Sequence, residues 1–539
     1  MPKKAAKKPK AKSRPGMSSQ VSHAPEPDAG VTIRMYCHGL GDCFLLTFPA
    51  AEKGESVRVL IDCGILQHAP GEASKMRAVA QDLLESTRRP DGKSYVDLLI
   101  VTHEHWDHLA GFAHGKDLFE KIEFGQVWLS WAENPGDPDA KAVKADLGKR
   151  RAKLQAALKV AETRMKTAFA ANDPSAAPLS QDLTAARDTL AFFGPPDPPS
   201  RSALAASKNP ASKADRVMTL GETMDWMREK ARPKNFRSPG ECHALPGAAG
   251  VKVYVLGPPR DPNKLRKMNP TGDQGYKLMA DRVSLSAAID DLDKAGLKES
   301  PDGPFDKRFR VSPEDAAQDP FFQHYYGFPD DPLGDPGASW RRIDNDWLVG
   351  GLSRLALQLD IGVNNTSLAL AFELPDGRTL IFPGDAQIGN WLSWDDVKFK
   401  DETGKKLTVR SKDLLNRAVF YKVAHHGSQN ATRRVGGLEE MKSGDLVVMI
   451  PTDEKFALTQ SKPHGWKMPA HGVYQALKQF SNNRILRADR DAKELDEIPD
   501  SWANDRDRVT FADKTFGDAA GTDKAAATRP LWVEYKVLT

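Results

Sequence analysis

The chain has 539 residues, of which 40% are hydrophobic and four are cysteine, and its formal net charge is +4. No apolar run approaches the length of a membrane-spanning helix, and no apolar signal region stands near the N-terminus, so we expect neither a membrane protein nor Sec-type export. The few cysteines show no paired zinc-ribbon spacing and argue against a disulfide scaffold, which favours a cytoplasmic protein.

Residues 1–30 are rich in Lys, Ala, Pro and Ser, and we expect a disordered basic tail. Seven Lys and Arg residues and no acid occur in positions 1–14, and without these seven charges the remainder carries −3. The near-neutral remainder gives no sign of a broad basic surface for long nucleic acid. The tail could contact nucleic acid or acidic partners, or could simply increase solubility.

The next stretch, 31–135, alternates like a sheet. Strands are predicted at 32–36, 44–48 and 57–61, then a helix near 72–88, then an apolar strand at 96–101. That last strand runs into a His-rich segment, which contains His103, Glu104, His105, Asp107 and His108. Imidazoles and carboxylates held rigidly after a strand suit Zn²⁺, Mn²⁺ or Fe²⁺.

Two long insertions are predicted next, and both are expected to lie outside the catalytic core. In the first, residues 139–172 form one polar helix with a thin apolar stripe, which packs either on a second helix at 180–193 or on a partner helix. A Pro-, Ser- and Ala-rich linker occupies 194–215. In the second, a strand at 251–258 precedes the irregular stretch 259–340, which is rich in Pro and Asp.

The C-terminal part contains further strands that end in polar side chains. Leu380-Ile381-Phe382 leads to Gly384-Asp385, and another strand runs into His425-His426-Gly427-Ser428. The strand 446–451 is followed by an amphipathic helix at 473–480, with His471 just before it.

Two of these segments resemble a known family. His103-Glu104-His105-Trp106-Asp107-His108 resembles the His-x-His-x-Asp-His signature of the metallo-β-lactamase-fold hydrolases. The His-His-Gly-Ser segment resembles the metallo-β-lactamase domain of the competence DNA-uptake channel and its soluble relatives. Gly39-Leu40-Gly41-Asp42 and Asn364-Asn365-Thr366-Ser367-Leu368 resemble further segments of that subgroup, so the likeness spans roughly 31–112, 345–430 and 446–490.

The resemblance implies a set of metal ligands. His103 and His105 would bind one metal, Asp107 and His108 a second, and Asp385 would bridge them. The last ligand is expected at His471, with His464 as the alternative, and Asp62 would orient the histidines from behind. No histidine ends a clear strand between the first motif and Asp385, so the first metal either has fewer protein ligands or is completed by His425. Zn²⁺ in one or two sites is expected, with Mn²⁺ as the alternative.

The implied fold is an α/β protein, an αββα metallo-β-lactamase sandwich with long helical and irregular insertions. Residues 31–135 and 345–539 would form its halves, with a helical insertion at 136–250 and a strand with an irregular insertion at 251–344. Asp107, His425 and His426 are the expected catalytic residues, and Lys422 could neutralise an anionic substrate.

The implied function is a metal-dependent phosphodiesterase or nuclease acting on a nucleic acid or nucleotide. The alternatives are a hydrolase of small esters, thioesters or lactams, because fold does not fix substrate, and an interaction protein with a retained metal site. A protein partner would bind through the insertion 136–250, and no membrane is expected to be involved.

Overall fold

The computed structural model describes residues 30–50, 55–170, 176–195, 217–230, 235–276, 351–462, 465–491, 506–517 and 528–538, together with the short segment 318–322 and the single positions 311, 315 and 502. These residues build two mixed sheets. The first has the order β14-β15-β1-β2-β3-β4-β5-β6 and the second β13-β12-β11-β10-β9-β8-β7. The first sheet contains β1 (Val31–Tyr36), β2 (Phe44–Phe48), β3 (Val57–Ile61), β4 (Ser94–Val101), β5 (Ile122–Ser130), β6 (Asn235–Arg237), β14 (Val509–Phe511) and β15 (Trp532–Val537). The second contains β7 (Cys242–Ala244), β8 (Lys252–Gly257), β9 (Ala369–Glu373), β10 (Thr379–Phe382), β11 (Ala418–Lys422), β12 (Val447–Ile450) and β13 (Ile485–Arg487).

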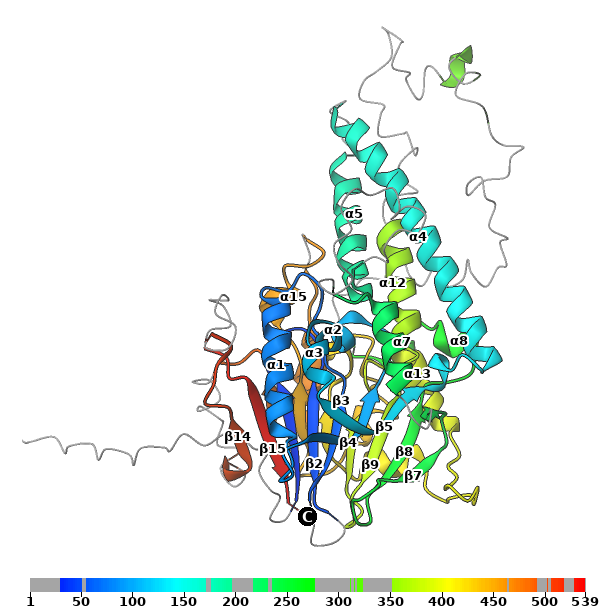
Figure 1. Cartoon of the computed structure of the whole chain (residues 1–539). Helices are drawn as coiled ribbons and strands as arrows, with labels where there is room; N and C mark the ends of the chain where they lie inside the picture. The colour runs from blue at the N-terminus through cyan, green and yellow to red at the C-terminus, as the bar shows by residue number, and fades with distance from the viewer. Residues whose placement is uncertain are drawn as a thin grey trace, which may run out of the picture.

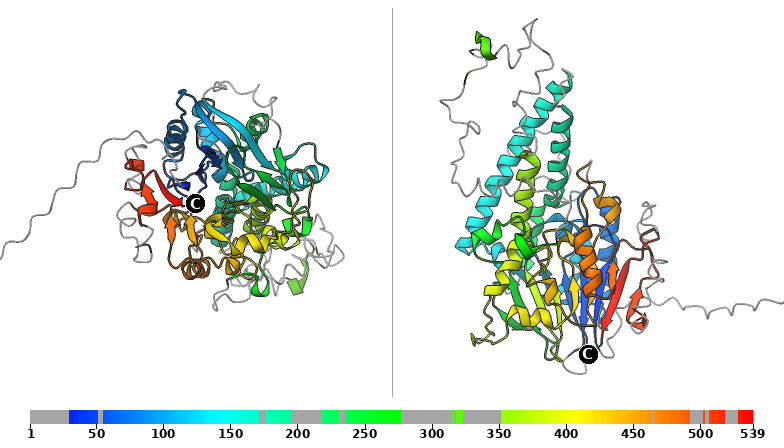
Figure 2. Two further views of the ribbon diagram at one scale, coloured as in Figure 1. Left: turned by 90° about the horizontal axis from the view of Figure 1, so that it is seen from below. Right: turned by 180° about the vertical axis from the view of Figure 1, so that it is seen from behind.

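The two sheets pack face to face around one hydrophobic core. The ring centroids of Phe44 and Phe382 lie 5.8 Å apart across it, as do those of Phe48 and Phe372. Helices α1 (Glu72–Ser86), α2 (Trp106–His114), α3 (Lys116–Phe119) and α7 (Leu220–Lys230) pack against the first sheet. Helices α13 (Ile388–Ser393), α14 (Ser411–Asn416) and α16 (His471–Phe480) cover the second sheet (Figures 1 and 2). The predicted α/β class is therefore confirmed.

Three helices form an arm that stands above the sheets in Figure 1. This three-helix arm consists of α4 (Pro138–Ala170), α5 (Ala176–Leu190) and α12 (Gly351–Asn364). Its helices share their own apolar cluster, which includes Leu154, Leu183 and Leu359. The predicted pairing of a long helix with a second helix is confirmed. Helix α12 was not predicted, and it packs against both of the others.

Some of the other predicted elements are present in the structure, and others lie outside the described residues. The strands and helices expected at 31–61, 72–88, 96–101, 251–258 and 473–480 are present. The irregular stretch 259–340 begins with the short turns α8 (Pro262–Leu265) and η3 (Gly272–Gln274). Most of the rest of that stretch, nearly all of the linker 194–215 and nearly all of the N-terminal tail lie outside the described residues. None of the described helices combines the length and the apolar character needed to cross a membrane.

The topology gathers several loops at one edge of the sandwich. Strands β3 and β4 are parallel, as are β10, β11 and β12, so the loops after them leave each sheet at one edge. The two edges are joined where the backbone N–H of Leu368 donates to the carbonyl of Thr102 over 2.9 Å. The polar segments predicted from the sequence come directly after these strands.

Candidate metal centre

The His-rich segment connects β4 to α2 and is held in place by Asp62, the residue after β3. The Asp62 carboxylate accepts hydrogen bonds from the backbone N–H of Thr102 at 2.8 Å and from its hydroxyl at 2.7 Å. The same carboxylate lies 2.8 Å from His108 Nδ1. This contact leaves His108 Nε2 as the nitrogen that faces the centre, as expected for a carboxylate that orients a metal-binding imidazole.

Four buried side chains meet beside this segment: Asp42, His108, Asp385 and His426. One ligand atom from each lies within 4.8 Å of all the others. His108 Nε2 is 3.1 Å from Asp385 Oδ2, and His426 Nε2 is 3.7 Å from the same oxygen. Asp107 adjoins the group, with Oδ2 at 2.9 Å from His426 Nε2. Such a mixture of imidazoles and carboxylates can hold a divalent metal ion.

Several ligand atoms in and beside this group form no hydrogen bond with any residue that the structure describes, although His108 Nε2 and Asp385 Oδ2 lie 3.1 Å apart as an ion pair. These ligand atoms are Asp42 Oδ1, Asp107 Oδ1, His108 Nε2 and Asp385 Oδ2, all in residues that are at most 2% exposed. Buried polar atoms in proteins are nearly always hydrogen-bonded, so unpaired atoms need an explanation. A cation among them would satisfy these atoms, and the residues therefore fit a metal ion.

His103 and His105 form a second pair of converging ligands. His103 Nε2 lies 3.1 Å from His105 Nδ1, and the other nitrogen of His103 is 3.0 Å from the Thr102 hydroxyl. Burial and the neighbouring histidines hold the pKa of His103 well below its usual range. Burial also lowers the pKa of His105 to about 4. Both imidazoles are therefore neutral near pH 7, the state in which they bind metals.

Lys422 supplies the one ammonium group found among these carboxylates in the described residues. Its Nζ donates to the Gly384 carbonyl at 2.9 Å and to Asp385 Oδ1 at 3.1 Å, and it also contacts Asp42. Burial alone would raise the pKa of Asp385, but Lys422 and His108 outweigh it and hold that pKa well below its usual range. For Asp42 burial dominates and raises the pKa to about 6.

Gly384 allows the close approach of the loop that carries Asp385. Its φ is 59°, and a Cβ atom there would lie 3.0 Å from Thr102 Cβ and 3.1 Å from Ser367 Cβ. A larger residue at this position would separate Asp385 from the His-rich segment.

The two histidines after β11 have left-handed backbones. His425 has φ 43° and His426 φ 54°, which costs roughly 1–2 kcal/mol per non-glycine residue. Their surroundings hold them there, because the N–H of His425 donates to Asp385 Oδ1 at 3.0 Å and His426 Nδ1 lies 2.6 Å from the Pro451 carbonyl. The turn aims His426 Nε2 at the metal cluster. His425 lies beside the cluster, where burial lowers its pKa to about 4.

The structure does not bring His471 to the cluster, which corrects the expectation for the last ligand. His471 is exposed at the first position of α16, because that helix turns Val473 and Leu477 into the core and leaves its first residue to solvent. His426, for which the sequence analysis expected a catalytic role, lies in the cluster instead. His464 lies outside the described residues. The sequence pattern marks Asp42 only as part of a Gly-rich loop.

The three-helix arm contacts the His-rich segment, a contact that the sequence analysis did not predict for the insertion at 139–172. Lys144 of α4 forms an ion pair with Glu104. The turn after α5, η2 (Ala191–Phe193), places the ring of Phe193 at 5.0 Å from that of His105. The ring of Phe192 lies 5.9 Å from His425 and stacks on Trp466 at 5.4 Å. Aromatic side chains therefore cover one side of the centre.

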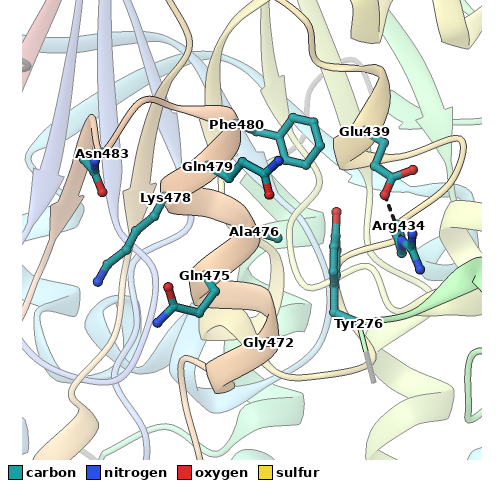
Figure 3. A pocket seen from close by; sticks show the side chains of 10 residues that line it. All are labelled: Tyr276, Arg434, Glu439, Gly472, Gln475, Ala476, Lys478, Gln479, Phe480 and Asn483. Atoms are coloured by element: carbon teal, nitrogen blue, oxygen red, sulfur yellow. Dashed lines mark hydrogen bonds and ion pairs between the residues drawn. The ribbon is translucent and has the colours of Figure 1, made fainter. Parts of the chain in front are cut away.

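A separate groove of about 730 Å³ lies along α16 (Figure 3). Tyr276 stands opposite Ala476 in this view, and Arg434 and Glu439 form an ion pair at its rim. None of the lining residues belongs to the metal cluster.

The chain matches no family model, no curated protein and no solved structure. The fold and the site together define an α/β protein with a buried cluster of carboxylates and imidazoles that can bind a metal ion.

Proposed function

We propose that the protein is a metal-dependent hydrolase of the metallo-β-lactamase type that cleaves phosphodiester bonds. The observation that carries this proposal is the buried group of Asp42, His108, Asp385 and His426, whose ligand atoms converge and in part have no hydrogen-bond partner. The order of the motifs along the chain supports the family, and its DNA-uptake subgroup supports the substrate class.

Each half of the centre has a ligand set in this proposal. His103 and His105 would hold one ion. Asp42, His108, Asp385 and His426, whose ligand atoms converge, would hold another, with Asp107 beside them. A bound divalent ion lowers the pKa of a coordinated water towards neutrality and polarises the scissile group.

The other polar residues orient groups or move protons. Asp107 Oδ1 is free of hydrogen bonds and can accept a proton from the attacking water. Both ring nitrogens of His425 already lie near polar side chains, Nδ1 at 2.8 Å from the Ser428 hydroxyl and Nε2 at 3.4 Å from the Asn364 amide, so we assign His425 the role of orienting these side chains. Lys422 is occupied by Asp42 and Asp385, so its role is to balance charge within the centre instead of binding substrate.

One observation favours the second candidate, a hydrolase of small esters, thioesters or lactams. The cluster residues are at most 2% exposed, and Phe192 and Phe193 lie over His425 and His105. An apolar cover of this kind suits a small substrate with apolar groups.

The test combines metal analysis with an activity panel. Purified protein is assayed with Zn²⁺ or Mn²⁺ on single-stranded DNA, RNA, cyclic nucleotides and chromogenic esters. We expect one to two bound ions per chain and phosphodiester cleavage. His103→Ala and His426→Ala should each lose bound metal and at least about 10²-fold in rate.

His471→Ala is the matched control, because it removes an exposed histidine close in sequence to the cluster loops. It should keep both metal and activity. Wild type that takes up no metal would overturn the proposal. Cleavage of esters alone would be consistent with the proposed metal centre and would favour the second candidate function, a hydrolase of small esters, thioesters or lactams.

A further inference from the structure

Helix α12 carries a buried carboxylate that faces the centre and that no motif predicted. Asp360 is 2% exposed. Its Oδ2 accepts a hydrogen bond from the side chain of Asn364 at 3.0 Å, whereas its Oδ1 bonds to no group among the described residues. The nearest imidazole nitrogen in this part of the chain is His105 Nε2, which lies 3.9 Å from Oδ1 and likewise forms no hydrogen bond there.

In each of the three histidines of the motif, one ring nitrogen faces another possible metal ligand and the other nitrogen faces an oxygen atom. His108 turns Nε2 to the metal cluster and Nδ1 to Asp62, and His103 turns Nε2 to His105 and Nδ1 to the Thr102 hydroxyl. His105 turns Nδ1 to His103, so its remaining nitrogen points to Asp360. Metal-binding imidazoles usually donate their second N–H to an oxygen that fixes the tautomer and the ring orientation. Asp360 faces the remaining nitrogen of His105 as Asp62 faces that of His108, but at 3.9 Å instead of 2.8 Å, so the carboxylate must move closer to His105 to accept its N–H.

We infer that Asp360 is the positioning residue of His105, accepting its Nε2–H while Nδ1 and His103 Nε2 bind an ion. This inference rests on the proposed metal centre but not on any substrate. It makes α12, a helix of the arm, part of the metal centre.

If Asp360 served only to stabilise the fold, replacing its carboxylate would destabilise the metal-free protein. Asp360 forms no ion pair with Lys or Arg among the described residues, and two further carboxylates, Asp107 and Asp385, lie in the same centre. A neutral group of the same shape therefore removes no favourable contact from the metal-free protein beyond hydrogen bonds to neighbouring side-chain amides. The negative charge of Asp360 is therefore favourable only when His105 binds a cation.

The test is Asp360→Asn, measured by direct titration of metal-free protein with Zn²⁺ and by the visible spectrum of the Co²⁺ form. We expect affinity for the weaker ion to fall about 10–100-fold and the Co²⁺ spectrum to change. The urea midpoint of the metal-free variant should stay equal to that of wild type or rise. Asp360→Glu, which restores the carboxylate, should recover part of the affinity.

Asp182→Asn is the matched control in the same arm. Asp182 is also buried, but it accepts the backbone N–H groups of Leu352 and Ser353 at 3.1 and 3.2 Å and so caps α12. The Asp182→Asn substitution should lower the urea midpoint and leave the metal affinity unchanged. Wild-type affinity in Asp360→Asn, or a loss of affinity matched by a loss of metal-free stability, would overturn the inference. Failure of wild type to bind Zn²⁺ would instead overturn the proposed function.

Discussion

At the scale of single residues, Lys422 shows how the centre tolerates so much negative charge. Its ammonium group is 1% exposed and touches Asp42 and Asp385 from two different loops. A buried charge without a partner is far more costly than a buried pair. Lys422 therefore lets these carboxylates lie side by side before any metal binds.

We predict that Lys422→Met destabilises the metal-free protein by about 3–5 kcal/mol, because it leaves two buried carboxylates without their cation. Added Zn²⁺ should restore part of that loss. Urea unfolding with and without metal measures both effects.

The control is Lys412→Met, which removes an ammonium that is 58% exposed and pairs with Glu440 at 3.1 Å. Exposed ion pairs contribute little, so this variant should unfold like wild type. Equal losses in the two variants would contradict the role given to Lys422.

Residues of the centre differ in how far the sequence could predict them. His103, His105 and His108 stand together after one apolar strand, so local sequence was enough. Asp42 and Asp360 meet them only through contacts between distant parts of the chain. His426 and His471 each sit next to a predicted element, and only the left-handed turn at His426 decides which one faces the cluster.

At the scale of elements, α1 anchors the helix that begins within the motif. The Glu72 carboxylate accepts the Trp106 indole N–H at 2.7 Å and lies 2.9 Å from His114 Nε2. Burial favours its protonated form, but the hydrogen bonds from His114 and Trp106 outweigh this effect and lower the pKa of Glu72. The start and the end of α2 are thus tied to one side chain.

We predict that Glu72→Gln costs about 1–3 kcal/mol at pH 7 and that this difference shrinks in acid. The folded pKa is depressed, so the unfolded chain binds more protons. The stabilisation is therefore complete above the unfolded value of about 4.3 and disappears as pH falls through the folded value. Urea unfolding of wild type and variant from pH 7 to pH 3 measures the difference.

Glu85→Gln serves as its control, since Glu85 lies on the same helix with 31% of its side chain exposed. The Glu85→Gln variant should lose less free energy of unfolding at pH 7 than the Glu72→Gln variant. A Glu72→Gln defect that persists unchanged at pH 3 would show that packing, not charge, is responsible.

Elements with a strong local pattern were predictable, and α12 was not. The apolar run of β4 predicts a strand, and the long stretch of helix-forming residues in α4 predicts a helix. Helix α12 ends in Asn364, which the sequence analysis considered only as the start of a segment that resembles the subgroup. The apolar residues Leu352, Leu359 and Val363 of α12 pack on α4 and α5, which lie far away in the sequence.

At the scale of the whole molecule, the metal centre joins parts that the sequence separates widely. The cluster takes Asp42 and His108 from the first sheet and Asp385 and His426 from the second. An ion bound there cross-links both sheets in the folded state alone. Ligands that bind only the folded state stabilise it by mass action.

We predict that chelation lowers the melting temperature and that free Zn²⁺ at about 100 times its Kd restores about 2.7 kcal/mol of stability. Calorimetry with EDTA, and again after adding Zn²⁺, measures the change. The double variant His108→Ala, His426→Ala should lose most of the Zn²⁺ effect, because only the His103 and His105 pair remains. A Zn²⁺ effect that survives in full would place the stabilising ion elsewhere.

The pairing of β1 with β15 has a consequence for how the protein is made. Arg34 on β1 bonds to Glu534 on β15 at 2.7 Å, and 500 positions separate the two. At about 5–20 residues per second, a ribosome needs about 25–100 s to deliver the second partner after the first. Throughout that interval β1 offers an open backbone edge, the kind of edge that recruits strands from other nascent chains. We therefore expect the yield of folded protein to fall when nascent chains of this protein are crowded together before β15 emerges.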